Sequence, residues 1–244
     1  MEKKSRINKY LSEVGFCSRR EADKLISSGK VYLNGKQAIL GDKVSFYDEV
    51  LVDNKKITPL IKHKIYIAFN KPLGIVCTTD KKREKNNIID YINFPHRIFP
   101  VGRLDKNSEG LIFLTNDGDI VNKILRSKNN HQKEYNVTVD KPITKRFIKE
   151  MQNGVPILDT VTKKCLLKQT GKKTFNIVLT QGLNRQIRRM CEYFGYIVKN
   201  LKRVRIMNIK LDVSRGKYRH ITKSELKEMK LMLSSSTKTH SEEK

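Results

Sequence analysis

Apolar residues in the first fifty positions follow helical spacing twice and then alternate, which predicts two helices followed by a small sheet. In RINKYLSEVG the apolar residues recur at helical spacing, and Gly15 follows them. A second helix is predicted from Ser18, which forms a capping box with Glu21, to Gly29. VYLNGKQAIL then predicts two short strands joined by an Asn-Gly turn. We therefore expect a compact domain over residues 5–52.

Residues 64–233 mix strand and helix patterns without strict alternation. IYIAFNKPLGIVCTT predicts two β-rich segments around a Lys-Pro-x-Gly turn. Further strands are predicted at 111–115, 133–139, 174–180 and 196–211, and helices at 119–126, 144–153, 184–194 and 222–233. This order favours an α+β fold with a mixed, largely antiparallel sheet. The polar stretch 53–63 is predicted as a linker and 234–244 as a disordered tail.

The charge balance indicates that this globular chain binds a polyanion. The chain has 51 Lys+Arg against 25 Asp+Glu, a formal net charge of +26. Such an excess repels itself in a compact fold, so it normally persists because a polyanion such as RNA compensates it. A generally basic proteome is the alternative explanation. The excess lies mainly in residues 61–244, which hold 39 basic and 17 acidic side chains.

Several classes of protein are disfavoured by what the sequence lacks. No apolar run reaches the roughly 20 residues of a membrane span, and the charged start has no secretory pattern, so we expect a cytoplasmic protein without membrane contact. The four cysteines form no CxxC pair, the five histidines form no HExxH, and no glycine-rich phosphate loop occurs. We expect reduced thiols, no metal site and no cofactor.

Asp105 is the most informative candidate for chemistry. It follows Gly102 in FPVGRLDKNSEGLIFLTNDGD, and the segment around it is apolar. An aspartate after a glycine turn is most often a surface or capping residue. Here the apolar neighbours predict a carboxylate at the edge of a core, where a cation is needed to hold it ionised.

Arginines crowd the first turn of two predicted helices, where the helix dipole disfavours positive charge. They are Arg19 and Arg20 in one helix, and Arg185, Arg188 and Arg189 in the other, which we expect to begin at Asn184 as N-cap. Phosphate is the natural partner for such residues, although they could equally extend into solvent. Arg188 has a local alternative, since Glu192 lies four residues later.

Two segments resemble known families. RINKYLSEVGFCSRREADKLISSGKVYLNGK resembles the S4-type RNA-binding domain, which grips structured RNA with two helices and a short sheet. GRLDKNSEGLIFLTNDG resembles the catalytic motif of the bacterial ribosomal RNA pseudouridine synthases of the RsuA group. From RINKY through RIMNI, the chain is most similar to the RluF type of that group, which acts on large-subunit rRNA.

The resemblance implies a role for particular residues. It makes Asp105 the catalytic nucleophile, Tyr135 in KEYNVTV the aromatic that stacks on the target base, and Arg185 the cation that pairs with Asp105. We expect the site to be supported by Lys71 and Pro72 of NKPLG and by Arg103 and Leu104. Residues expected to contact RNA are Arg6, Lys9, Arg19, Arg20, Arg188, Arg189, Lys202, Arg203 and Arg205.

The implied reaction is the isomerisation of uridine to pseudouridine, which needs no redox step, hydrolytic water or metal. It needs an extruded base and a carboxylate that attacks C1′, adds to C6 or abstracts a proton toward a glycal. The expected target is a hairpin loop of 23S rRNA, free or in a pre-ribosomal particle, bound by a monomer. Alternatives are 16S rRNA, a tRNA anticodon loop, or a non-catalytic S4-type RNA-binding protein. A glycoside hydrolase would need two carboxylates and fits the basic charge poorly.

Overall fold

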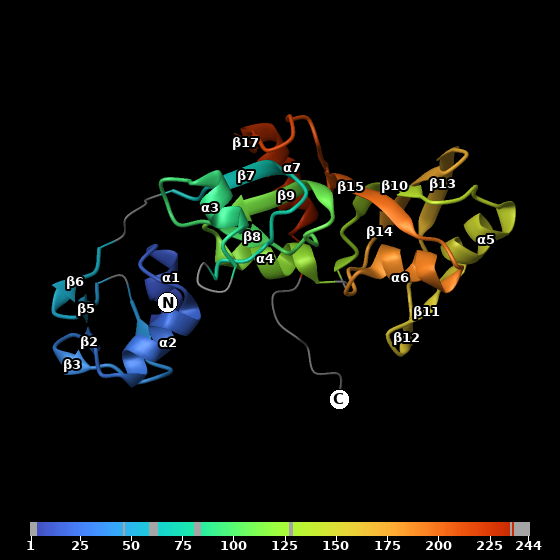
Figure 1. Cartoon of the computed structure of the whole chain (residues 1–244). Helices are drawn as coiled ribbons and strands as arrows, with labels where there is room; N and C mark the ends of the chain where they lie inside the picture. The colour runs from blue at the N-terminus through green and yellow to red at the C-terminus, as the bar shows by residue number, and fades with distance from the viewer. Residues whose placement is uncertain are drawn as a thin grey trace. The chain divides into compact units, whose positions relative to one another are not determined.

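The computed structural model describes residues 4–45, 47–58, 63–80, 84–126, 129–234 and 236. The chain forms two compact units (Figure 1). The small unit comprises residues 1–64 together with 94–98, and the large unit comprises 65–93 and 99–244. No helix in these described ranges is long and apolar enough to cross a membrane.

The small unit packs two helices against short strands. A four-stranded sheet has the order β3-β2-β5-β6, and β1 pairs with β4. The elements are β1 (Ser5–Arg6), α1 (Ile7–Glu13), α2 (Arg19–Ser27), β2 (Val31–Leu33), β3 (Lys36–Gln37), β4 (Lys43–Val44), β5 (Val50–Val52) and β6 (Lys55–Lys56).

Local signals in the sequence explain this unit. The Glu21 N–H donates to Ser18 Oγ at 3.1 Å, which caps α2 as predicted. Asn34 and Gly35 both have positive φ, +50° and +78°, and so make the tight turn between β2 and β3. The prediction of a linker from residue 53 was wrong at its start, because β6 pairs with β5. Its two exposed lysines carry no apolar alternation that would have revealed a strand. Residues 59–62 of the predicted linker lie outside the described residues.

The large unit is built on one mixed sheet whose strand order is β13-β14-β10-β15-β9-β7-β17, with β16 beside β15 and β8 beside β9. Figure 1 shows β13, β14 and β10 at one end of this sheet and β7 and β17 at the other. The elements are β7 (Tyr66–Lys71), α3 (Ile88–Ile92), β8 (Phe99–Val101), β9 (Glu109–Thr115), α4 (Gly118–Leu125), β10 (Lys133–Val139), α5 (Lys145–Asn153), β11 (Pro156–Ile157), β12 (Thr160–Val161), β13 (Leu166–Gly171), β14 (Thr174–Leu179), α6 (Gln186–Tyr193), β15 (Val198–Ile206), β16 (Ile209–Lys210), β17 (Tyr218–His220) and α7 (Lys223–Met232).

The sheet confirms the α+β prediction. Among the strand pairs of the described chain, β9 and β15 run parallel and the others run antiparallel. β7 and β9 are buried along their whole length, and both have a strand on either side. Apolar residues of α4 and α7 pack against these two strands in one core cluster. The predicted capping box of Thr222 and Glu225 is present at the start of α7.

The parallel contact between β9 and β15 depends on a glycine. Gly110 has φ +105° and lies opposite Arg203. A Cβ at Gly110 would stand 2.3 Å from the Arg203 carbonyl oxygen and 2.7 Å from its backbone nitrogen. A side chain would therefore force the two strands apart, so glycine is what permits this close pairing.

Two of the differences from the predicted element boundaries lie after residue 180. The strand expected over 196–211 is a hairpin of β15 and β16, because Met207 adopts positive φ and turns the chain back. The helix expected from 184 begins at Gln186. Most of the expected disordered tail, 234–244, lies outside the described residues.

Candidate active site

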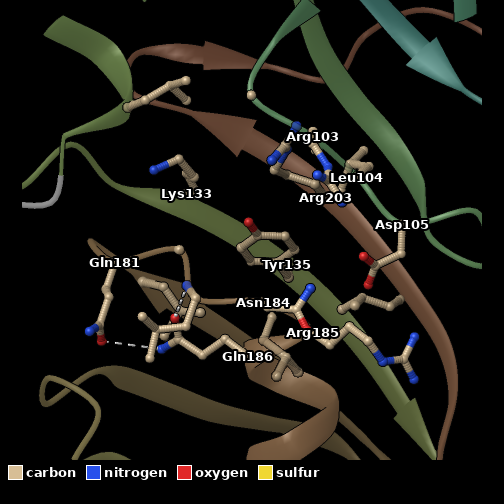
Figure 2. Close-up of a pocket in the computed structure, with 17 residues that line it drawn as sticks. Arg103, Leu104, Asp105, Lys133, Tyr135, Gln181, Asn184, Arg185, Gln186 and Arg203 are labelled. Carbon is tan, nitrogen blue, oxygen red and sulfur yellow. Dashed lines mark hydrogen bonds between the residues drawn. The ribbon is translucent and has the colours of Figure 1, made fainter. Parts of the chain in front are cut away.

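The large unit contains a pocket of about 430 Å³ (Figure 2). Its lining residues come from six segments: residues 102–105 after β8, Leu125 at the end of α4, strand β10, Leu179 at the end of β14, residues 181–187 leading into α6, and strand β15. Asp105 contributes the single carboxylate among the residues that line it. The candidate nucleophile predicted from sequence therefore faces a cavity.

The backbone around Asp105 is held by defined contacts. Asp105 is half-buried and its neighbour Leu104 is buried. The Leu104 N–H donates to Cys77 Sγ at 3.4 Å, and the Ser108 N–H donates to the Asp105 carbonyl at 3.0 Å. The carboxylate thus projects from a turn that is fastened on both sides, which is the pre-organisation a reacting group needs.

Lys71 is a buried cation close to this turn. Its side chain is fully buried, and its ammonium donates to the carbonyl oxygens of Pro72 and Ile75, both at 2.8 Å. Burial lowers the pKa of Lys71, whereas the charges of Cys77 and Asp105 act in the opposite direction. Lys71 therefore places a buried positive charge that interacts with the Asp105 carboxylate.

Arg188 is the second buried cation that interacts with Asp105. One guanidinium nitrogen donates to the Asn107 carbonyl at 2.6 Å, and another donates to the Val198 carbonyl at 3.1 Å. Burial lowers the pKa of Arg188, and the negative charge of Asp105 opposes that shift. The expectation that Arg188 contacts RNA or pairs with Glu192 is corrected: the side chain is 8% exposed and ties α6 to the turn after Asp105.

Arg185 does not have the predicted arrangement. In the part of the chain that the structure describes, no ion pair within 4.0 Å joins Arg185 to Asp105, although both line the pocket (Figure 2). Arg185 is exposed and occupies the N-cap position of α6 with φ +49°, so Asn184 is not the N-cap. Lys71 and Arg188, by contrast, are buried cations whose pKa values respond to the charge of Asp105.

Tyr135 forms a wall of the pocket as expected for an aromatic that stacks on a base. It is 8% exposed and lies opposite Arg203 in the β10–β15 register, next to a bulge. The Arg203 guanidinium carbon lies 5.9 Å from the centroid of the Tyr135 ring. Arg203 was expected at the surface as an RNA contact, but it is 4% exposed and donates to the Leu111 carbonyl at 2.6 Å.

Lys133 is a pocket residue that the sequence analysis missed. It lines the pocket two residues before Tyr135 on β10 and is 7% exposed. Burial, reinforced by the charge of Arg203, lowers the pKa of Lys133 to about 8. The strand alternation of KEYNVTV was the available signal, since it puts Lys133 and Tyr135 on the same face.

The other predicted site residues are distributed as follows. Arg103 is exposed at the pocket and Leu104 is buried beside it. Arg205 is already engaged, because its guanidinium contacts Glu134 at 2.7 Å and the Met207 carbonyl at 2.8 Å. The remaining basic residues lie at the surface of their own units: Arg6, Arg19 and Arg20 are exposed, and Lys9, Arg189 and Lys202 are half-buried.

Two family models match the chain, and one of them covers most of the residues that line the pocket. A model described as RNA pseudouridylate synthase matches residues 65–193, and a model described as S4 domain matches residues 5–50. The chain belongs to the RNA pseudouridylate synthase family.

Related proteins are similar to the synthase over nearly its whole length. It is 58% identical over 223 residues to the Dual-specificity RNA pseudouridine synthase RluF of Escherichia coli strain K12, covering 91% of this chain and 77% of that protein. It is 33% identical to the Ribosomal large subunit pseudouridine synthase B of Bacillus subtilis strain 168, covering 93% and 96%. A crystal structure of a pseudouridylate synthase superimposes with a TM-score of 0.68 at 28% identity, covering 92% and 99%.

These findings confirm the resemblance to the RsuA group and to its RluF type, with an S4 domain at the start of the chain. The synthase is an isomerase that acts on RNA, and the alternatives of a purely RNA-binding protein or a glycoside hydrolase are excluded.

Proposed function

We propose that this synthase converts uridine to pseudouridine in 23S ribosomal RNA, with Asp105 as the nucleophile. The observation that carries the proposal is the single carboxylate on the pocket wall, in a pocket that also contains Tyr135. An extruded uridine stacked on Tyr135 would bring its sugar and base toward Asp105.

The reaction requires few groups besides this carboxylate and this aromatic ring. The N1–C1′ bond breaks, the uracil turns, C5 bonds to C1′, and the proton on C5 leaves to restore the ring. A carboxylate attacking C1′, adding to C6 or abstracting a proton toward a glycal must be ionised at the start. Lys71 and Arg188, whose pKa values respond to the charge of Asp105, place two buried positive charges near this carboxylate.

The ribosomal target rests on the relatives and on charge. One relative is named as an enzyme of the large ribosomal subunit, and the net charge of +26 suits a long RNA. A second RNA substrate is also proposed, because the relative at 58% identity is named as dual-specificity. A loop of 16S rRNA or a tRNA anticodon loop would present an unpaired uridine of the same kind.

Pseudouridine mapping tests both parts. Ribosomal RNA and tRNA from a strain that lacks this gene are compared with RNA from the same strain carrying the wild-type gene or Asp105→Asn. We expect at least one 23S pseudouridine to disappear on deletion, to return with the wild-type gene and to stay absent with the variant. Loss confined to other RNAs would contradict the 23S assignment, and restoration by Asp105→Asn would contradict the nucleophile.

A further inference from the structure

The pocket carries far more positive than negative charge. Its lining contains the four cations Arg103, Lys133, Arg185 and Arg203 against the one carboxylate of Asp105. Two of these cations are nearly inaccessible, since Lys133 is 7% and Arg203 is 4% exposed. Buried charges are normally paired, because removing an ion from water without compensation is strongly unfavourable.

In the part of the chain that the structure describes, neither Lys133 nor Arg203 forms an ion pair. Arg203 Nε donates to the Leu111 carbonyl, but its Nη2 is buried without a hydrogen-bond partner. Within the described ranges, no hydrogen bond or ion pair engages the Lys133 ammonium. The nearest acid in sequence, Glu134, is on the opposite face of β10, where it pairs with Arg205 at 2.7 Å.

The two cations also act on each other. The charge of Arg203 adds to burial in lowering the pKa of Lys133. Figure 2 shows both side chains around Tyr135, with Lys133 on one side of its ring and Arg203 on the other side, toward Asp105. The protein therefore holds two like charges in a cavity where, among the described lining residues, Asp105 is the one carboxylate, at the place where the proposed substrate base would stack.

We propose that Lys133 and Arg203 form a phosphate subsite that takes the phosphate group adjoining the target uridine. This inference rests on the proposed function, because it places the uridine on Tyr135. A phosphate brings a full negative charge and several acceptor oxygens, which can satisfy both cations. A uracil carbonyl oxygen is a weaker candidate, because it carries only a partial charge.

The strand geometry supports a nucleotide spanning the two positions. Lys133 and Tyr135 are alternate residues on one face of β10, so they are about 7 Å apart along the strand. A base against the ring thus leaves its own backbone within reach of the cations. The subsite would orient the nucleotide so that its sugar faces Asp105, which makes Lys133 and Arg203 binding residues rather than reacting ones.

The test compares nucleotide binding by the full chain and by Lys133→Met, which keeps the length of the side chain and removes its charge. Uridine, uridine 5′-monophosphate and uridine 3′-monophosphate are titrated by calorimetry. Lys168→Met is the matched control, because Lys168 is exposed on β13 and is not part of the pocket. Thermal unfolding checks the fold of both variants.

We expect wild type and Lys168→Met to bind one of the monophosphates at least about tenfold more tightly than uridine. Lys133→Met should bind uridine as wild type does but lose the preference, and it should unfold at the same or a higher temperature. The inference is overturned if wild type shows no such preference, if it binds none of the three, or if Lys133→Met retains the preference. A preference for the base alone would assign the cations to a uracil carbonyl instead.

An activity assay distinguishes a failure of the phosphate subsite from a failure of the proposed function. The hairpin that contains the mapped uridine is made with a neutral methylphosphonate on either side of that uridine. Wild type should lose at least about tenfold in kcat/KM with one of these substrates, and Lys133→Met should be insensitive to the change. Wild type that isomerises both modified hairpins at the normal rate would refute the subsite while leaving the reaction intact. Absence of pseudouridine formation on the unmodified hairpin would instead refute the function.

Discussion

Replacing Arg188 with methionine should remove the fastening of the turn that carries Asp105. Arg188 links this turn to α6 and β15 through the carbonyls of Asn107 at 2.6 Å and Val198 at 3.1 Å. Methionine fills much of the same space but donates no hydrogen bond. The neighbouring Arg185, exposed at the same pocket, makes no such contact with the turn and serves as the matched control position.

The expected effect follows from these contacts. A hydrogen bond from a charged group contributes about 1.5–3 kcal/mol, and an orphaned buried carbonyl adds to the loss. Against this, methionine avoids the desolvation of a buried guanidinium. Asn107 is exposed, so water can replace its lost partner, whereas the Val198 carbonyl is buried. We therefore expect Arg188→Met to lower the free energy of unfolding by about 2 kcal/mol. A displacement of the Asp105 turn by about 1 Å would lower kcat about 100-fold.

Urea unfolding and single-turnover rates at saturating RNA measure the two effects. Arg188→Met should lose kcat with KM nearly unchanged, because a buried guanidinium is not available to phosphate. Arg185→Met should retain kcat and bind RNA more weakly. The slope of the logarithm of its binding constant against the logarithm of salt concentration should become shallower by about one unit. The reasoning fails if Arg185→Met loses more kcat than Arg188→Met, or if Arg188→Met turns over normally and only binds less RNA.

Three further predictions follow from single positions. Asp105→Asn should bind RNA as wild type does but turn over at less than about 1% of its rate; single-turnover kinetics above that level would count against a nucleophile. Gly110→Ala should lose more than about 3 kcal/mol of unfolding free energy in urea, because its Cβ would stand 2.3 Å from the Arg203 carbonyl; Gly182→Ala, with nothing within 4 Å, is the control. Wild type should gain up to about 3 kcal/mol of stability relative to Lys133→Met between pH 8 and 10.5. The pKa of Lys133 is about 8 folded and 10.5 unfolded, so below pH 8 the folded state bears the full penalty of the buried charge, and above it the folded state sheds its proton first. A stability difference that is the same at pH 7 and pH 10 would disprove the assignment.

Much of the fold could be predicted because the signals are local. The Asn34-Gly35 hairpin, the cap at Ser18 and the capping box at Thr222 depend on residues within four positions of one another. β10 has the predicted bounds, since its period-two alternation continues from end to end. The two-residue strand β6 was missed, because its two exposed lysines give no apolar pattern that would predict its pairing with β5.

Some residues of the candidate site could likewise be identified from local sequence motifs, and others could not. Sequence motifs were sufficient to single out Asp105 and Tyr135, and the structure places both on one pocket. Arg185 was given its role by the family resemblance, and its pairing with Asp105 stays a prediction. Arg188 was expected to contact RNA, with Glu192, four residues away, as a local alternative partner. One of its hydrogen-bond acceptors, the Asn107 carbonyl, is instead 81 residues away.

By itself, the sequence determined the two-domain order, the secondary structure over most of the chain, the basic character and the candidate nucleophile. Tertiary structure alone decided which of the many cations are buried and what they face. A lysine or arginine is solvated or desolvated according to the strands and helices that close over it, and those come from distant parts of the chain. Lys133 lies on β10, Arg188 on α6 and Arg203 on β15, and all three side chains are buried. Arg185, only three residues from Arg188, stays exposed because it lies at the end of its helix.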